Sequence, residues 1–133
     1  METRRQPRVN VSLKVITEVA KSSTQKFSLA GGKSFDVKGV DISVSGVGVI
    51  SKHFLPKGLI IELEIEGLAF GLREAIRVKA RVCYCRYLKS FEYRCGMEFI
   101  DISPKYKDAI GKFISAHERR KDPRLKLSEE YET

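Results

Sequence analysis

Three arginines stand within five residues near the start of the chain, in Arg4-Arg5-Gln6-Pro7-Arg8, just before the first apolar alternation. Proline disfavours a helix here, so we expect an extended segment. Guanidinium groups bind phosphate in a bidentate manner and also stack on aromatic bases. The segment is therefore a candidate arm for a phosphorylated or nucleotide ligand, although a solvated basic terminus fits the same residues.

A second polar group stands at the predicted exit of a strand, in Asp41-Ile42-Ser43-Val44-Ser45-Gly46. Asp41 and Ser43 are two residues apart, so they share one side of an extended chain and offer an acceptor and a donor to the edge of a base. Gly46 removes a side chain where a ligand or another backbone comes close. An Asx or Ser turn between two strands explains the same pattern.

The residues that usually perform catalysis are sparse. The two histidines, His53 and His117, are far apart, and the three cysteines lack C-x-x-C spacing. We therefore expect no metal, no catalytic residues and no enzyme. Cys83, Cys85 and Cys95 are predicted to be reduced and structural, with Cys83 and Cys85 on the same side of one strand.

The surrounding pattern predicts the elements that position these residues. At 133 residues and 42% hydrophobic composition, the chain suits one small domain with a core. Alternation of apolar and polar residues predicts strands at 9–15, 27–29, 35–37, 45–50, 59–65, 76–84 and 93–99. A hairpin turn is predicted at 30–33, and Val40 and Ile42 lead into the strand at 45–50. Tyr84 falls on the apolar side of its strand. Ser103-Pro104 then starts a helix whose apolar face runs from Tyr106 to His117.

This order predicts a mainly β fold: a small antiparallel β-barrel of about six strands with one C-terminal α-helix. The barrel and helix occupy residues 1–118. Residues 119–133, basic and then acidic, form a tail that we expect to be flexible. Its basic part, Arg119 to Arg124, is a second phosphate-binding arm or basic partner surface, the first residues of a further domain, or a solvated helix end next to the C-terminal dipole.

Taken together, the two polar motifs resemble those of the PilZ domain family. The match consists of Arg-x-x-x-Arg (Arg4 to Arg8) followed by Asp-x-Ser-x-x-Gly (Asp41 to Gly46) on a β-rich chain. Tyr93-Arg94-Cys95-Gly96-Met97-Glu98-Phe99 and the helix after it are similar to that family's closing strand and terminal helix. The resemblance runs from about Arg4 to about His117.

The resemblance implies a non-enzymatic receptor that uses no cofactor and binds cyclic dimeric GMP, a bacterial second messenger. Arg4 and Arg8 would bind phosphate and stack on guanine, and Asp41 would read a guanine edge. The full implied set is Arg4, Arg5, Arg8, Asp41, Ser43 and Gly46, with Gly96 as a further position. Family members with arginine just before the first motif often hold an intercalated ligand pair. Thr3 stands there, which favours one ligand molecule.

The expected mechanism is a signal carried by the N-terminal arm. Arg8 and Asp41 are expected to be exposed in the free domain, so alanine at either position would abolish binding and leave thermal stability unchanged. Ligand would order the arm over the barrel and present a new surface to a protein partner in motility, pilus or exopolysaccharide control. We expect a cytoplasmic monomer or weak dimer without membrane insertion.

Two other functions fit part of the sequence. The chain has 25 basic and 17 acidic residues, a net charge of +8, which suits anionic partners. A basic β-barrel that binds single-stranded nucleic acid would need exposed aromatic platforms. The chain has no tryptophan and no such aromatic signature, which argues against nucleic acid. The remaining alternative is a PilZ-like adaptor that acts through protein contacts without nucleotide.

Overall fold

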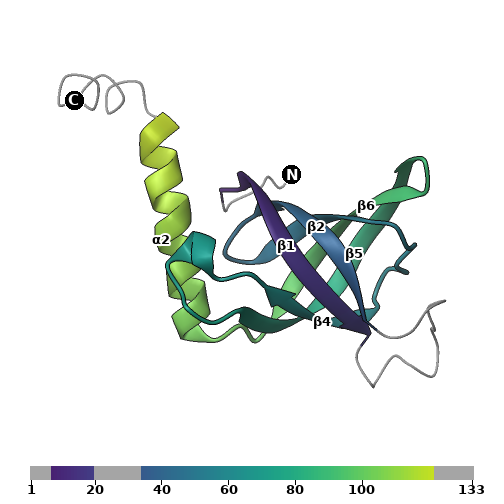
Figure 1. Ribbon diagram of the computed structural model, residues 1–133, viewed down its shortest axis with the longest axis horizontal. Helices are drawn as coiled ribbons and strands as arrows, with labels where there is room; N and C mark the ends of the chain where they lie inside the picture. Colours follow the sequence, from purple (N-terminus) through teal and green to yellow (C-terminus); the bar gives the residue numbers. More distant parts are fainter. Residues whose placement is uncertain (1–6, 20–33, 122–133) are drawn as a thin grey trace.

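The strands form a closed antiparallel barrel with one long helix beside it, in a computed structural model that describes residues 7–19 and 34–121. The elements are β1 (Val9–Val19), β2 (Ser34–Ile42), β3 (Gly46–Ser51), β4 (Ile60–Ile65), η1 (Leu68–Phe70), β5 (Ile76–Lys89), β6 (Glu92–Ile100) and α2 (Pro104–Lys121). Around the barrel the order is β1-β2-β3-β6-β5-β4, with β4 paired to β1 (Figure 1). The predicted fold is confirmed. The predicted strand at 27–29 and the turn at 30–33 lie outside the described residues, as do Arg4 and Arg5.

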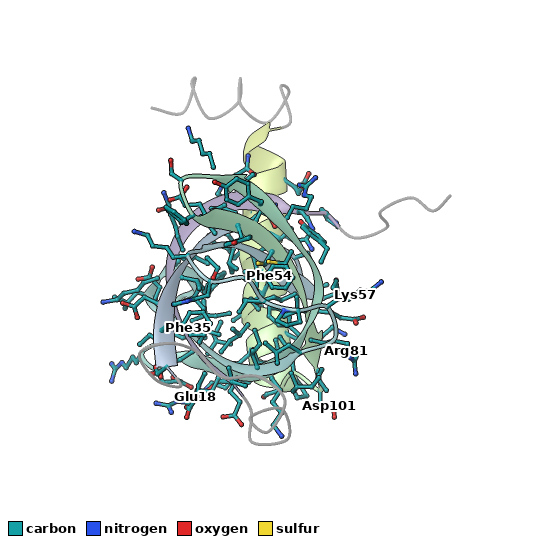
Figure 2. All side chains as sticks on the ribbon, turned by 90° about the vertical axis from the view of Figure 1, so that its right-hand side faces the viewer. Glu18, Phe35, Phe54, Lys57, Arg81 and Asp101 are labelled. Carbon is teal, nitrogen blue, oxygen red and sulfur yellow. The ribbon has the colours of Figure 1, made fainter. Side chains whose placement is uncertain are left out.

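Alternating apolar side chains fill the interior of the barrel. Strand β4 buries Ile61, Leu63 and Ile65 and turns Glu62 outward, as its alternation predicts. The same rule places the inward side chains of the other strands in one continuous core. Figure 2 views the barrel end-on, with side chains filling the ring of strands.

Helix α2 covers one end of the barrel. Its first turn is capped by the Ser103 hydroxyl, which accepts a hydrogen bond from the Lys105 amide at 3.3 Å. Ile110 and Ile114 are buried, and the Phe113 ring meets Phe70 of η1 edge-on, with centroids 4.9 Å apart. The helix ends at Lys121, and 122–133 lie outside the described residues, so the division of the chain at 118 stays a prediction. In the part of the chain that is described, no helix is long and apolar enough to span a bilayer.

Three irregularities interrupt the strand register near one part of the barrel wall. They fall between Asn10 and Leu13 in β1, between Gly39 and Asp41 in β2, and between Val82 and Tyr84 in β5. An extra residue in a strand increases its twist and re-aims the side chains beside it. The irregularities therefore decide which side chains face outward at this point.

The irregularity in β5 overturns two predictions. Alternation holds through the buried Val82, but Cys83 is an extra residue, and Tyr84 faces outward with 39% of its surface exposed. Tyr84 is therefore not on the core side. Cys83 is exposed while Cys85 contacts the buried Cys95, so Cys83 and Cys85 do not share a side.

Candidate ligand-binding site

One residue from each of five neighbouring strands forms a row across the outer wall of the barrel. Strand pairing aligns Asn10 with Asp41, Asp41 with Gly48, Gly48 with Gly96, and Gly96 with Tyr84. The two glycines lie side by side at the centre of the row. They make a floor of bare backbone, bordered by a carboxylate on one side and an aromatic ring on the other. We call this surface the glycine seat.

Glycine is needed at both positions because planar side-chain groups of Asp41, Arg94 and Tyr84 lie directly over the backbone there. A Cβ at Gly48 would stand 2.7 Å from Oδ1 of Asp41 and 2.9 Å from Nη2 of Arg94. A Cβ at Gly96 would collide with the ring of Tyr84, at 2.8 Å from its Cζ. Real Cβ atoms do not approach other atoms this closely, so a side chain at either position would displace its neighbours.

Asp41 is held between two arginines that are far apart along the chain. Arg8, the residue before β1, places Nη1 at 2.7 Å from Oδ1 of Asp41. Arg94 of β6 pairs with Oδ2 and also donates from Nε to the Tyr84 hydroxyl at 3.4 Å. Burial opposes the charge on Arg94, but its hydrogen bonds to Tyr84 and Asp41 outweigh this effect and raise its pKa.

These contacts overturn the expectation that Asp41 is exposed. Its side chain is only 10% exposed, because Arg8 and Arg94 cover both carboxylate oxygens. Arg8 is itself half-buried, at 30% exposure of its side chain. Asp41 is therefore part of the packed structure of the free domain and not a free acceptor on its surface.

The seat opens into a cavity of about 370 Å³, within the usual size range of small-molecule sites. Its lining residues are Arg8, Asn10, Asp41, Gly48, Tyr84, Arg94 and Gly96. Two guanidinium groups face one carboxylate, so the lining is net positive. It offers cations for phosphate, an acceptor for N–H groups and a ring for stacking. Among the residues described, no cluster of histidine, cysteine, aspartate and glutamate is suited to a metal ion.

The other two residues of the Asp-x-Ser-x-x-Gly motif shape the turn between β2 and β3. The Ser43 hydroxyl accepts a hydrogen bond from the Ser45 amide at 3.2 Å, and the Ser43 amide donates to the Gly46 carbonyl at 2.9 Å. A Cβ on Gly46 would collide with the Met97 carbonyl of β6. The neighbour that comes close to Gly46 is thus the backbone of another strand. Ser43 and Gly46 lie beside the cavity and do not line it.

The structure brings together three of the predicted positions, Arg8, Asp41 and Gly96, and adds four that sequence reasoning missed: Asn10, Gly48, Tyr84 and Arg94. Tyr84 was missed because the extra residue in β5 reverses its side. Arg94 lies on the polar side of β6, as its alternation indicates, but no spacing along the chain connects it with Asp41. The register of β2, β3 and β6 makes that connection.

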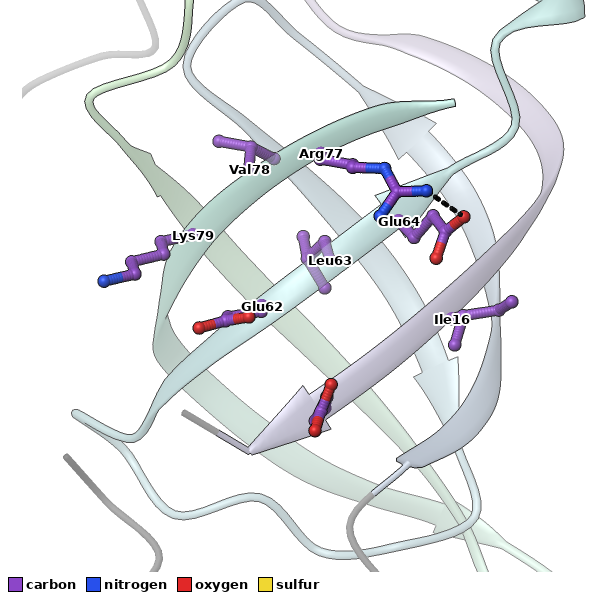
Figure 3. Close-up of a pocket in the computed structure, with 8 residues that line it drawn as sticks. Ile16, Glu62, Leu63, Glu64, Arg77, Val78 and Lys79 are labelled. Atoms are coloured by element: carbon purple, nitrogen blue, oxygen red, sulfur yellow. Dashed lines mark hydrogen bonds and ion pairs between the residues drawn. The ribbon is translucent and has the colours of Figure 1, made fainter. Parts of the chain in front are cut away.

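A second cavity, of about 310 Å³, lies on another part of the wall (Figure 3). It is lined by Ile16, Glu18, Glu62, Leu63, Glu64, Arg77, Val78 and Lys79 of β1, β4 and β5. Its charges are three carboxylates against two cations, and Arg77 pairs with Glu64 at 3.3 Å. Glu18 lies directly opposite Glu62, an unfavourable juxtaposition of like charges. We call this surface the acidic wall; its charge is the reverse of what an anionic ligand needs.

The family model of the PilZ domain matches residues 2–116, which is most of the chain. The chain belongs to the PilZ domain family. The family assignment agrees with the resemblance that the two sequence motifs indicated.

Known relatives agree at the level of the fold. An uncharacterized protein of Aquifex aeolicus is 35% identical over 80 residues, which are 56% of this chain and 35% of that protein. The Bacillus subtilis inhibitor of motility MotI/DgrA superposes with a TM-score of 0.69 at 16% identity, over 92% of this chain and 54% of that chain. The PilZ domain with c-di-GMP of YcgR from Escherichia coli gives 0.64 at 16% identity, over 90% and 94%. The chain therefore spans about a third of the Aquifex protein and about half of MotI.

Proposed function

We propose that this domain binds cyclic dimeric GMP on the glycine seat and acts as a receptor for it. The observation that carries the proposal is the buried Asp41 carboxylate, held beside a two-glycine floor by Arg8 and Arg94. Membership of the PilZ family and the likeness to the c-di-GMP-bound domain of YcgR support the choice of ligand.

In this proposal a guanine stacks on the Tyr84 ring, which itself lies over Gly96, and its edge faces the Asp41 carboxylate beside Gly48. Asp41 then accepts hydrogen bonds from the N–H groups on the guanine edge. Each oxygen can accept a second hydrogen bond, but the two arginines leave the Asp41 side chain only 10% exposed, so one of them must move to admit the guanine edge. Arg8 is the one that moves, since it precedes β1 and has no strand partner of its own, whereas Arg94 is fixed within β6.

Binding is therefore an exchange of partners. Arg8 leaves Asp41 for a ligand phosphate, where Arg4 and Arg5 join it, and guanine takes its place on the carboxylate. The new hydrogen bonds are charge-assisted and contribute about 1.5 to 3 kcal/mol each. Micromolar affinity corresponds to about 8 kcal/mol in total, so several such bonds are needed to offset the lost ion pair and the ordering of the arm. Ser43 and Gly46 contribute by holding the turn that fixes Asp41.

The exchange supplies the signal. The segment that carries Arg4 to Arg8 is drawn from Asp41 onto the ligand, so the surface beside β1 changes and a protein partner reads the change. Motility control fits the likeness to an inhibitor of motility, and pilus or exopolysaccharide control remains an alternative. The receptor is proposed to work in the cytoplasm and to hold one ligand molecule, as Thr3 suggests.

Calorimetric titration tests the ligand and the site together. Wild type is expected to bind cyclic dimeric GMP saturably at micromolar concentration, without binding GTP or a short single-stranded oligonucleotide. Arg8→Ala removes the phosphate contact and is expected to weaken binding at least tenfold. Lys79→Ala, a cation on the acidic wall, is the matched control and leaves affinity unchanged. Equal losses of affinity in both variants would mean that the net charge of the domain, and not the glycine seat, determines binding.

One observation favours a second candidate, a nucleotide-independent adaptor. Both oxygens of Asp41 are paired without ligand, so its ion pairs with Arg8 and Arg94 also fit a purely structural role, in which they connect Arg8, β2 and β6. An adaptor would give no heat with cyclic dimeric GMP at any tested concentration, and Arg8→Ala would then act on stability alone.

A further inference from the structure

Beneath the glycine seat, two thiols face each other across neighbouring strands. Cys85 of β5 and Cys95 of β6 are register partners, and their sulfur atoms are 3.0 Å apart. We propose that Cys85 and Cys95 are a redox-active dithiol, which a small-molecule disulfide converts into a cross-strand disulfide bond. This inference does not depend on the ligand proposed above.

The backbone geometry permits the bond without moving the strands apart. Directly paired residues of antiparallel strands have Cα atoms about 4.5 to 5.5 Å apart. Disulfides accept Cα separations of about 4.4 to 6.8 Å, with sulfur atoms about 2.05 Å apart. The two sulfurs therefore need to approach each other by about 1 Å, a distance that rotation of the side chains covers.

The surroundings of the two thiols assign them different roles. Cys85 is partly exposed, and its sulfur accepts hydrogen bonds from the Leu55 amide at 3.3 Å and from the Cys95 thiol at 3.0 Å. Cys95 is fully buried, and burial, with the hydrogen bond to Cys85, raises its pKa. Cys85, the more exposed thiol, is therefore the one that attacks the oxidant. Cys95 is the resolving thiol, which attacks the mixed disulfide on Cys85.

The reaction is a two-step thiol–disulfide exchange. The Cys85 thiolate attacks one sulfur of the oxidant RSSR, forming a mixed disulfide and releasing RS⁻. Cys95 then gives up its proton and attacks the Cys85 sulfur, which releases the second RS⁻. The protein loses two protons and two electrons, and one RSSR becomes two RSH.

The position of the bond gives it a structural consequence. Cys85 follows Tyr84, and Cys95 lies between Arg94 and Gly96, so the disulfide would join the two strands directly below the seat. It would also link the base of the hairpin formed by β5 and β6, whose tip extends beyond the barrel (Figure 1). Oxidation is expected to stabilise this hairpin against local opening.

The test is peptide mapping by mass spectrometry after incubation with oxidised glutathione, with Cys83→Ser as matched control. Cys83 is exposed on the same strand but has no partner thiol in register. Wild type and Cys83→Ser are both expected to yield a Cys85–Cys95 cross-linked peptide, reversed by dithiothreitol. Cys95→Ser is expected to accumulate glutathione on Cys85.

Two results would overturn the proposal. One is a map of wild type and Cys83→Ser in which Cys85 and Cys95 remain free thiols. The other is a cross-link that includes Cys83 in place of either partner. Both results come from proteins that keep the pair intact, so they decide the matter even where Cys95→Ser does not fold.

Discussion

The glycine seat and the acidic wall are two cavities of similar volume on one barrel, and both are lined by carboxylates and cations. In the acidic wall the charges stay in solvent: Arg77 is 73% exposed and Glu64 39%. In the seat Asp41 is 10% exposed, and Arg94 is 26% exposed. Exposed ion pairs contribute about 0 to 1 kcal/mol, whereas a desolvated charge depends strongly on its partners. Burial, more than the number of charges, separates the two cavities.

The floors differ as well. The seat has two neighbouring glycines at its centre, so side chains from the adjacent strands lie over bare backbone. The acidic wall has ordinary side chains at every position, and its ion pair joins register partners, Glu64 and Arg77. The glycines therefore let Asp41, Arg94 and Tyr84 lie close against the barrel wall, an arrangement that the acidic wall does not have. The following substitutions break or sharpen this contrast, in order of decreasing effect.

Asp41→Ala is expected to have the largest effect, because it leaves Arg8 and Arg94 close together without a counter-charge. We expect a loss of about 2 kcal/mol in the free energy of unfolding, measured by urea denaturation, and complete loss of ligand binding. Glu64→Ala on the acidic wall is the control and is expected to change stability by less than about 0.5 kcal/mol. An unchanged urea midpoint for Asp41→Ala would show that the buried pair has no structural role.

Gly48→Ala is expected to weaken ligand binding more than tenfold, since the new methyl group occupies the place of the Asp41 and Arg94 head groups. The accompanying loss of stability is about 1 kcal/mol, typical of overpacking. Gly111→Ala in α2 is the matched control: a Cβ there would meet Val44 at 3.7 Å, an ordinary contact, and alanine favours a helix. Calorimetry and thermal melts of both variants check the prediction, which equal affinities would contradict.

Tyr84→Ala tests the aromatic border of the seat. Loss of stacking on a base costs about 1 to 3 kcal/mol, so affinity is expected to fall roughly tenfold. Tyr87→Ala, on the same strand and 60% exposed, serves as control and leaves affinity unchanged. If Tyr87 proves as important as Tyr84, the ligand lies further along the hairpin than we propose.

Arg77→Ala is expected to have the smallest effect. Its pair with Glu64 is exposed, so the free energy of unfolding changes by less than about 0.5 kcal/mol, and ligand affinity stays the same. A loss of affinity comparable to that of Arg8→Ala, measured by titration at the same ionic strength, would place the ligand on the acidic wall.

Much of this fold was predictable from the sequence because it depends on local patterns. Alternation found the strands from Val9, Leu59 and Tyr93 onward, and Ser103-Pro104 marked the start of the helix. The motif around Asp41 located one border of the site. These features require only neighbours along the chain, and the structure confirms the elements among its described residues.

The missed parts depend on how strands pair. An extra residue in β5 turned Tyr84 outward and Cys85 inward, and no residue type in that strand signals where the irregularity falls. The contact of Asp41 with Arg94 spans 53 positions, and it exists because the intervening strand carries glycine at 48. For the same reason the sequence suggested an exposed carboxylate where the structure has a buried one.

The central claim is that cyclic dimeric GMP binds on the glycine seat, and the amide signals of Gly48 and Gly96 test it most directly. In a two-dimensional ¹H–¹⁵N NMR titration of the full chain, both signals are expected to shift saturably with ligand. The amide of Gly111, on α2, is expected to stay in place. Saturable shifts confined to the acidic wall or to α2, or no shift at Gly48 and Gly96, would contradict the account.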